Sequence, residues 1–275
     1  MVRVSTRRRR YDRNEVDFRT AIVRQGGTLE PRPPARAWRS WRNTALRSRD
    51  DVDTAVSTLV TAGLVPHPDR AKNWDGLVAL GTILERVPRR FEVLEMGAAR
   101  YSPLLRWLYQ FGYRGLVGID LVYAEASRRG PIRTLPMDLT DTTFEDGSFG
   151  AIACLSVIEH GVDTEAYLRE ASRLLRPGGV LVTSTDYWPD ATDTRGATAY
   201  GAPVRVFERP EIEAFLASAA RHGLFPIGPV DLDTQDRVVH WDRVELDYTF
   251  LVLSLVKRPR GLAEWATALV SRLGR

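Results

Sequence analysis

The sequence predicts an α/β fold in which helices cover a doubly wound, mostly parallel sheet. From Phe91 onward, short apolar runs alternate with stretches of helical periodicity. One of these runs, residues 149–155 (FGAIACL), is apolar throughout, which is typical of a strand buried on both faces. Strands that are separated by helices form βαβ units around a parallel sheet.

Each element of this sheet domain follows from its periodicity and its breakers. We expect strands over residues 91–96, 115–121, 132–135, 149–155, 180–184, 236–241 and 246–256. Helices are expected over 101–111, 163–175 and 210–222, and Pro177-Gly178-Gly179 ends the second of them. Because ligands bind at the carboxyl ends of parallel strands, the loops after these strands are the candidate site.

The chain before the sheet is predicted to hold two helices. Val52, Ala55 and Leu59 fall on one helical face, and a second apolar run ends at Pro88. We therefore expect four parts: an irregular basic arm over 1–45, a helical cap or lid over 46–90, the sheet domain over 91–257 and an amphipathic helix over 258–275.

Composition excludes several classes of protein. The 275 residues are 44% hydrophobic and 27% charged, as in a globular chain with a substantial core. The apolar runs are too short for a membrane span. The basic residues near the start of the sequence are not followed by the apolar segment that a secretory signal requires. The single cysteine, Cys154, excludes an internal disulfide and a cysteine-based metal site. A cytoplasmic protein is expected.

The charge is unevenly distributed along the chain. Residues 1–50 hold 14 Arg and five acidic residues, whereas the remainder holds 25 basic and 30 acidic ones. A basic arm can attract nucleic acid or anionic lipid. No aromatic-interleaved basic repeat follows Arg7–Arg10, so a solvated arm is favoured and a nucleic-acid partner is not expected.

The loops after the first three strands carry acidic residues. Glu95 precedes the small-residue turn Gly97-Ala98-Ala99, which lacks the G-x-G-x-x-G of a pyrophosphate site. A carboxylate there would repel a pyrophosphate and suits a cationic amino-acid ligand. Asp120 ends the second strand, where an acid can accept hydrogen bonds from ribose hydroxyls. Asp138 follows the third strand and could accept a bond from an adenine amino group.

These loops together resemble the class I S-adenosylmethionine-dependent methyltransferases. The matching segments are VLEMGAARYS, VGIDL, MDLTDTTFEDGSFGAI, LSVIEHG and LREASRLLRPGGVLVTSTDYW, in the order and spacing of the family. The resemblance covers residues 91–256 and implies a Rossmann-like, seven-stranded sheet whose last strand is antiparallel. It implies S-adenosyl-L-methionine as the cofactor, with these binding residues: Glu95, Gly97 and Ala98 beside the methionine part, Asp120 and Leu121 at the ribose, Asp138 and Leu139 at the adenine, and Ser156 near the methyl group.

Two features of the sequence depart from the family pattern. Ala98 and Ala99 stand where many members carry glycine, which could narrow the cofactor loop. Gly150 replaces a frequent acid at the start of a strand. The segment from His67 to Asp75 resembles a bacterial subgroup that is associated with polysaccharide or glycolipid genes, and this association does not fix a substrate.

A hydroxyl acceptor requires a general base near the transferred methyl group. Of four candidates, His160 and Asp186 are favoured, since both follow strands at the cofactor edge. His160 could instead only shape the cofactor pocket, and Asp186 could be a solvated loop residue. Glu159 is expected to orient a neighbour, and His240 to be a satisfied strand residue. Asp186, Asp190 and Asp193 could surround a metal ion, but loop aspartates are usually turn formers, so no metal is expected.

The leading functional hypothesis is O-methylation of a small molecule, glycan or glycolipid. An RNA or protein methyltransferase using the basic arm and a catalytically silent cofactor-binding protein are the alternatives. Leu262, Trp265, Leu269 and Leu273 form an apolar stripe flanked by arginines. This stripe could dock on the protein itself, form a homodimer, or contact a membrane surface peripherally; docking is favoured.

Overall fold

The computed structural model describes residues 34–100, 102–199 and 201–258. These residues all fall within one compact unit, which begins at Pro31. The predictions for residues 1–33 of the basic arm and for the apolar stripe after Arg258 therefore lie outside the described residues. Among the described residues, no helix is long and apolar enough to cross a membrane.

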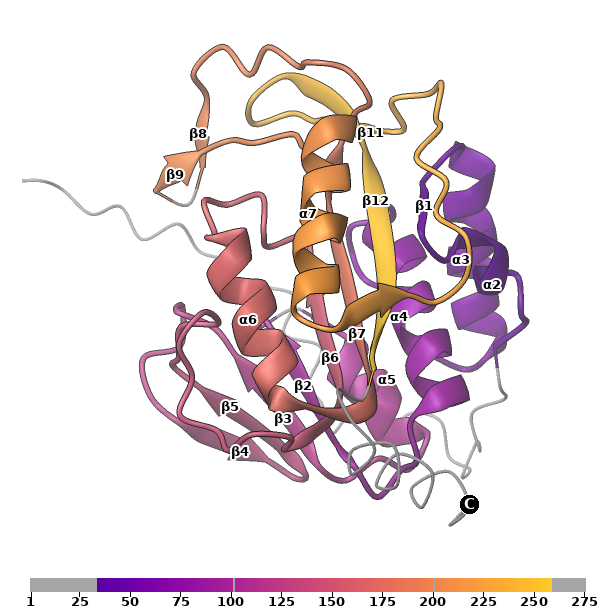
Figure 1. Ribbon diagram of the computed structural model, residues 1–275. Helices are drawn as coiled ribbons and strands as arrows, with labels where there is room; N and C mark the ends of the chain where they lie inside the picture. Colours follow the sequence, from indigo (N-terminus) through magenta and orange to yellow (C-terminus); the bar gives the residue numbers. More distant parts are fainter. Residues whose placement is uncertain (1–33, 101, 200, 259–275) are drawn as a thin grey trace, which may run out of the picture. The chain divides into compact units, whose positions relative to one another are not determined.

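Five parallel strands form the centre of one mixed sheet (Figure 1). Their spatial order is β5 (Ile132–Leu135), β3 (Leu116–Ile119), β2 (Glu92–Met96), β6 (Phe149–Leu155) and β7 (Leu175–Tyr187). The last long strand, β12 (Leu246–Lys257), pairs antiparallel with β7. The Rossmann-like, mostly parallel sheet with an antiparallel last strand is thus confirmed.

Short strands widen this sheet beyond the seven that the resemblance implied. The described part of the sheet has ten strands. The additional pieces are β4 (Ser127–Arg129), which pairs with β5, and β1 (Thr44–Ala45), β10 (Leu224–Pro226) and β11 (Val239–Trp241), which all pair with β12. Segments of two or three residues are too short to show a strand periodicity in the sequence. A separate hairpin joins β8 (Thr198–Ala199) to β9 (Ala202–Pro203).

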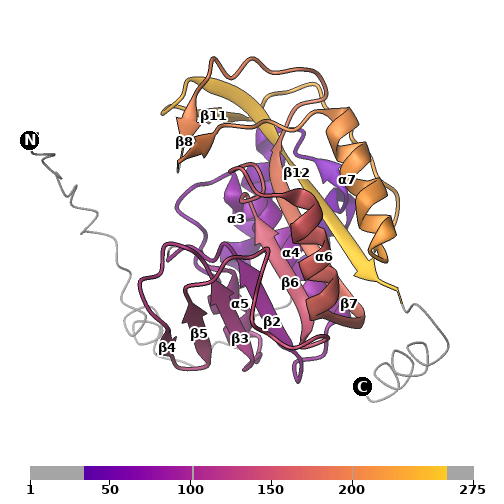
Figure 2. The same cartoon turned by 60° about the vertical axis from the view of Figure 1, so that its left-hand side comes forward.

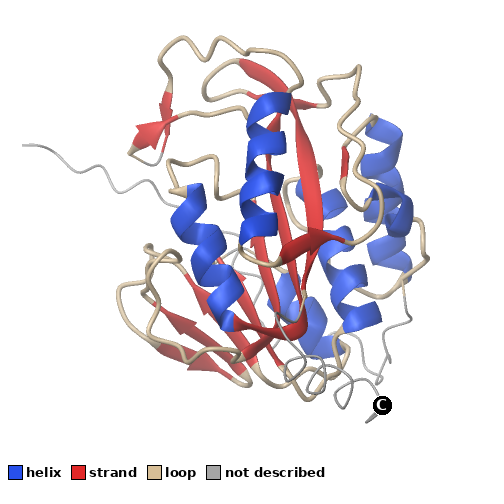
Figure 3. Cartoon of the chain, viewed as in Figure 1, coloured by secondary structure: helices blue, strands red, loops and turns tan. Residues whose placement is uncertain are grey.

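Helices cover both faces of the sheet. The helices α6 (Thr164–Leu174) and α7 (Arg209–Arg221) lie on one face, and α3 (Arg49–Thr61), α4 (Lys72–Arg86) and α5 (Leu104–Gln110) lie on the other (Figures 1 and 3). Asp163 caps α6 by accepting bonds from the backbone N–H groups of Glu165 and Ala166. The helix α5 starts later than expected, because Pro103 disfavours a helical conformation for the residue before it.

The strands β6 and β7 form the buried middle of the fold (Figure 2). In β6 all residues except Leu155 are fully covered, as the apolar run predicted. The strand β7 is longer than expected and runs through Pro177-Gly178-Gly179 as far as Tyr187. Asp186 therefore belongs to a buried strand and not to an exposed loop, which corrects the expectation for that residue.

The helix α4 packs against the sheet along most of its length. Eleven of its 15 residues are buried, including Trp74 and Asp75 in its first turn. Trp38, in the short helix α2 (Trp38–Trp41), lies so close to Gly81 that an added Cβ would be 2.3 Å from its ring. Whether residues 46–90 act as a cap or lid stays a prediction.

Candidate functional site

The turn after β2 brings the backbone close to a neighbouring loop. Gly97 has a φ of 73°, and a Cβ there would lie 2.3 Å from a methyl group of Val157. The N–H groups of Gly97 and Ala98 both donate to the carbonyl of Ile119, at 2.8 and 3.0 Å. Only glycine combines this φ with this close approach, so the turn is fixed by the residue at position 97.

Glu95 places a buried carboxyl group beside this turn. Its side chain accepts a hydrogen bond from Ser102 Oγ, and the residue is 4% exposed. Burial raises the pKa of Glu95 to about 7, while the Ser102 bond and the charge of Arg106 lower it in part. A buried carboxyl group with a raised pKa gains most from a cationic ligand, which favours its charged form.

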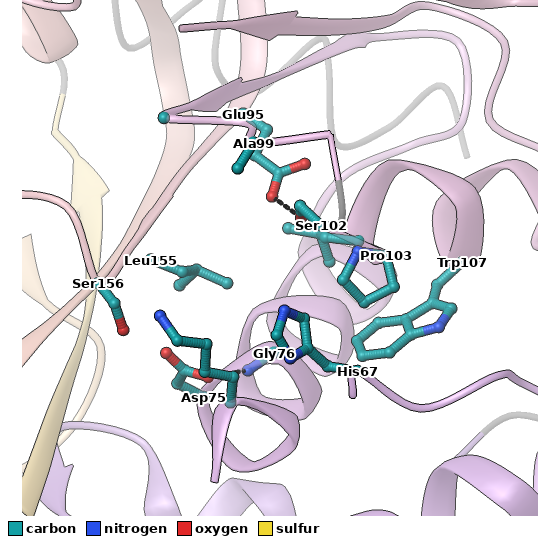
Figure 4. A pocket seen from close by; sticks show the side chains of 13 residues that line it. His67, Asp75, Gly76, Glu95, Ala99, Ser102, Pro103, Trp107, Leu155 and Ser156 are labelled. Atoms are coloured by element: carbon teal, nitrogen blue, oxygen red, sulfur yellow. Dashed lines mark hydrogen bonds between the residues drawn. The ribbon is translucent and has the colours of Figure 1, made fainter. Parts of the chain in front are cut away.

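A pocket opens next to Glu95, as Figure 4 shows. Its wall combines the turn after β2, the start of α5, the end of β6 and the beginning of α4. The lining residues are His67, Lys72, Asp75, Gly76, Glu95, Gly97, Ala99, Ser102, Pro103, Leu104, Trp107, Leu155 and Ser156. The segment from His67 to Gly76 thus contributes to the same pocket as the predicted cofactor residues.

Ser156 is the pocket residue with an unsatisfied polar atom. It follows β6 with a φ of 52°, and its N–H donates to Ser184 through the backbone oxygen at 3.2 Å and the hydroxyl at 3.0 Å. Its own Oγ is buried and has no hydrogen-bond partner. Since buried polar atoms are normally paired, this hydroxyl indicates a place for a polar ligand atom.

The other predicted cofactor residues lie outside this pocket, at the ends of adjacent strands. Asp120 follows β3 and accepts a bond from the N–H of Val122 at 2.9 Å. Leu121 is 75% exposed next to it. Asp138 follows β5 and accepts two bonds from Thr140, at 2.8 Å from N–H and 2.7 Å from Oγ1. Leu139 packs partly against the core. In both turns the aspartate uses Oδ1, so Oδ2 remains an acceptor.

A second group of carboxyl groups is buried near the ends of β6 and β7. Asp75, Glu159 and Asp186 are 1%, 1% and 3% exposed. Burial raises the pKa of Asp75 to about 6 and that of Glu159 to about 7, and it raises that of Asp186 well above its usual range. The positive charge of Lys72 lowers all three values in part. We call the three carboxyl residues Asp75, Glu159 and Asp186 the buried acid cluster.

From the sequence, no individual role was assigned to Asp75 or Lys72. Asn73 explains how the loop before α4 is held: its side chain accepts from the N–H of His67 at 2.7 Å and donates to the carbonyls of His67 and Arg70, each at 3.0 Å. The signal was the segment from His67 to Asp75, whose polar residues are unusually dense before an apolar helix.

The two predicted general bases have different environments. His160 has a pKa that is lowered to about 4 by burial and by the charge of Lys72, so its imidazole is neutral at pH 7. Its ring packs edge-on against Trp241, with centroids 6.5 Å apart. Asp186 is hydrogen-bonded to Tyr248, and burial raises its pKa well above its usual range, which favours the protonated carboxyl group. His240 is exposed and contacts Asp247 at 2.8 Å, as expected for a satisfied strand histidine.

The possible metal ligands do not gather. Asp186 is buried, whereas Asp193 forms a turn by accepting a bond from the N–H of Arg195 at 2.8 Å. In the part of the chain that the structure describes, no group of three or more His, Cys, Asp or Glu residues is arranged to hold a metal ion.

With this geometry in view, residues 94–183 match the sequence profile of a family described as the methyltransferase domain. The matched segment runs from β2 to β7 and includes Glu95, Asp120, Asp138 and Ser156. This segment, about a third of the chain, is therefore similar to a methyltransferase domain.

Curated relatives of this methyltransferase domain match over a short stretch. The ubiquinone biosynthesis O-methyltransferases of Xanthomonas oryzae pv. oryzae are 46% identical over 41 residues, which is 15% of this chain and 17% of theirs. The match therefore spans about a sixth of the length of these relatives.

Solved structures are similar at low sequence identity. The 1,6-didemethyltoxoflavin-N1-methyltransferase of Burkholderia thailandensis is 19% identical, with a TM-score of 0.47, over 78% of this chain and 92% of that one. A geranyl diphosphate C-methyltransferase of Streptomyces coelicolor A3(2) is 16% identical, with a TM-score of 0.49, over 70% and 86%. An S-adenosylmethionine-dependent methyltransferase of Mesorhizobium loti is 16% identical, with a TM-score of 0.45, over 68% and 98%.

The two departures from the family pattern have structural explanations. Ala98 is buried with its Cβ against Gly118, where an added Cβ would be 2.8 Å away. Ala99, in contrast, lines the pocket, and the narrowing of a cofactor loop by its methyl group stays a prediction. At Gly150 an added Cβ would lie 2.7 Å from the Cβ of Phe91 and 2.8 Å from Val87, which leaves no room for an acidic side chain.

Proposed function

We propose that the protein uses S-adenosyl-L-methionine to methylate a hydroxyl group of a small molecule. The observation that carries this proposal is the pocket in which the buried carboxyl group of Glu95 faces the same space as the unpartnered hydroxyl of Ser156. These groups fit the ammonium and the polar atoms of an amino-acid ligand. When bound, S-adenosylmethionine supplies a methyl group on a sulfonium, which an acceptor oxygen attacks in line.

In this proposal, the residues along the carboxyl edge of the sheet each bind a different part of the cofactor. Glu95 binds the ammonium, and the turn at Gly97 allows the backbone to approach the methionine part. Asp120 accepts bonds from the ribose hydroxyls through its available carboxylate oxygen, with Leu121 alongside. Asp138 and Leu139 receive the adenine. Ser156 lies toward the methyl group, next to the buried acid cluster.

The buried acid cluster supplies a proton acceptor for the hydroxyl. Glu159 and Asp186 are close enough for each charge to affect the other, so they titrate as a pair. With Asp186 protonated, Glu159 is ionised above about pH 7 and can take the hydroxyl proton as the new oxygen–carbon bond forms. Asp186 then holds the second proton of the pair, and the neutral imidazole of His160 borders the acceptor.

The acceptor class is supported from two directions. The curated relatives that match part of the chain are named as O-methyltransferases, which supports an oxygen acceptor. Trp241, which is partly exposed beside His160, provides aromatic surface on which a sugar ring or an aromatic ring can lie. A glycan or glycolipid acceptor remains the narrower prediction from the subgroup resemblance.

The test is a methyl-labelling assay. Purified protein is incubated with S-adenosylmethionine that carries a labelled methyl group, together with fractions of metabolites, cell-envelope glycans and lipids. We expect label in a hydroxyl-bearing product, identified by mass, and binding of the demethylated cofactor in calorimetry. Absence of binding for both cofactor forms would overturn the proposal. A labelled RNA or protein in place of a small product would overturn the acceptor class.

A further inference from the structure

A chain of buried hydrogen bonds connects the helix α4 to the cofactor pocket. Ser184 Oγ, on β7, donates to Asp75 Oδ2 at 2.5 Å. Ser184 Oγ also accepts a hydrogen bond from the N–H of Ser156, at 3.0 Å. Asp75, Ser184 and Ser156 are 1%, 1% and 9% exposed, so all three hydrogen-bonded residues are buried.

The directions of these hydrogen bonds determine how the Ser184 hydroxyl is oriented. Asp75 accepts at both oxygens, since Oδ1 takes the N–H of Gly76 at 2.7 Å. The Ser184 hydroxyl must therefore give its proton to Asp75, which leaves its lone pairs for the N–H of Ser156. A buried donor or acceptor that loses its partner is costly, so removing the carboxylate would free the Ser184 hydroxyl to rotate.

Ser156 needs to be held in place because its backbone is strained. A φ of 52° is unfavourable for a residue other than glycine, and such conformations persist where the surroundings impose them. Both acceptors of the Ser156 N–H belong to Ser184. The consequence appears in the pocket, where the Ser156 hydroxyl is buried without a partner (Figure 4).

We propose that Asp75 is a positioning residue for cofactor binding, which acts through Ser184 to hold Ser156 in the left-handed conformation that presents its hydroxyl to the cofactor. The inference rests on the proposed function. It assigns the start of α4, which lies outside the matched methyltransferase segment, a direct effect on the affinity of the cofactor site. A purely space-filling role would not require a hydrogen-bond acceptor at this position, because an apolar side chain fills a buried space at lower cost.

The experiment measures the binding of S-adenosylhomocysteine by calorimetry at pH 8, where Asp75 is ionised. The variants are Asp75→Ala, Asp75→Asn, Ser184→Ala and the double variant Asp75→Ala with Ser184→Ala. Thr82→Val is the matched control, since Thr82 is also a buried polar residue of α4 but lies away from the pocket lining. Thermal unfolding checks that each variant is folded.

We expect Asp75→Ala and Ser184→Ala each to weaken binding about tenfold, as for the loss of one charge-assisted hydrogen bond. The double variant should bind no more weakly than either single one, because both changes break the same chain. Asp75→Asn keeps an oxygen that can accept from Ser184 and should recover most of the affinity. Thr82→Val should bind as the unchanged protein does.

Other outcomes separate the two proposals. If the unchanged protein does not bind the ligand, the proposed function fails. If it binds and both single variants bind equally well, or if the losses in the double variant add, the positioning role is wrong. Should Asp75→Ala not fold, Ser184→Ala and Asp75→Asn decide alone: a Ser184→Ala protein with unchanged affinity, or an Asp75→Asn protein that is as weak as Ser184→Ala, overturns the inference.

Discussion

At the scale of single residues, Glu95 links cofactor binding to a proton. Its pKa of about 7 in the free protein results mainly from burial. A bound ammonium favours the ionised form, so the pKa falls when the ligand enters. At pH 6.5 we therefore expect S-adenosylhomocysteine to displace a proton, and at pH 8.5 to displace almost none. Calorimetry in two buffers with different ionisation enthalpies measures this release directly.

The control for this prediction is Glu95→Gln, which removes the titrating group and keeps the shape. That variant should bind more weakly and release no proton at either pH. A heat of binding at pH 6.5 that is the same in both buffers would show that Glu95 is already ionised in the free protein, and would remove the electrostatic basis for its role.

Asp120 is the second residue for which an individual effect can be predicted. Replacing it by alanine removes up to two charge-assisted bonds to the ribose, each contributing roughly 1.5–3 kcal/mol. The binding constant of S-adenosylhomocysteine measured by calorimetry should fall accordingly. Asp141→Ala is a suitable control, because Asp141 is an exposed acid on the loop after β5. An Asp120→Ala protein that is folded and binds with unchanged affinity contradicts the assignment.

At the scale of elements, the first turn of α4 controls the charge of the buried acid cluster. Lys72 lowers the pKa of both Glu159 and Asp186. In a Lys72→Met protein these pKa values should rise, and the acidic limb of the kcat profile should move to higher pH. Turnover of the identified acceptor, measured from pH 6 to 9, checks this. Arg70→Met removes a nearby exposed cation, paired with Asp53, and should leave the limb in place. An unshifted limb in Lys72→Met would exclude this pair as the base.

The long elements could be predicted from the sequence, and the short ones could not. The strand at 149–155 and the helices near 164–174 and 209–221 show periodic or continuous apolar patterns that tertiary contacts merely reinforce. By contrast, β1 and β10 are strands because β12 offers them hydrogen bonds, which no local pattern encodes. The strand β7 crosses Pro177-Gly178-Gly179 for the same reason, since its partners β6 and β12 are already in place.

The site residues also divide into those that the sequence predicted and those that only the fold brings together. Glu95 and Gly97 were predicted from the turn after the first strand, and Ser156 was implied by the family resemblance; the structure brings all three to one pocket. The role of Asp75 could not be found, since its partner Ser184 is 109 positions away. Burial also changes how Asp186 is interpreted. The sequence suggested a solvated base, whereas burial raises its pKa and favours the protonated carboxyl group.

At the scale of the whole molecule, the buried carboxyl groups give stability an unusual dependence on pH. Burial raises the pKa values of Glu95 and Glu159 to about 7 and that of Asp75 to about 6, and it raises the pKa of Asp186 well above its usual range. In the unfolded chain such groups ionise near pH 4. The folded protein therefore holds protons that the unfolded chain has lost. Its stabilisation by these groups is complete below about pH 4 and is lost as the pH rises through about 7.

Two buried histidines give the folding stability the opposite dependence on pH, over a lower range of pH. Burial lowers the pKa of His160 to about 4 and also lowers that of His67. The unfolded chain takes up these protons near pH 6.5, so the two residues reduce stability as the pH falls below that value. The exposed His240 has a raised pKa and adds to the carboxyl effect. At pH 6.5 the imidazoles of the unfolded chain are about half protonated, and they become neutral as the pH rises, so the carboxyl groups dominate above this value.

We therefore expect the free protein to unfold at a higher temperature at pH 6.5 than at pH 8.5, measured by calorimetry at constant ionic strength. Glu95→Gln should flatten this slope, because it removes one of the groups that lose a proton in the range. Glu165→Gln should not, since the pKa of Glu165 is lowered to about 2 by bonds from Ser218 and His222 and the group is ionised throughout. An unfolding temperature that rises from pH 6.5 to 8.5 would mean that the cluster is already charged in the folded state, and that Lys72 neutralises it more fully than its burial opposes.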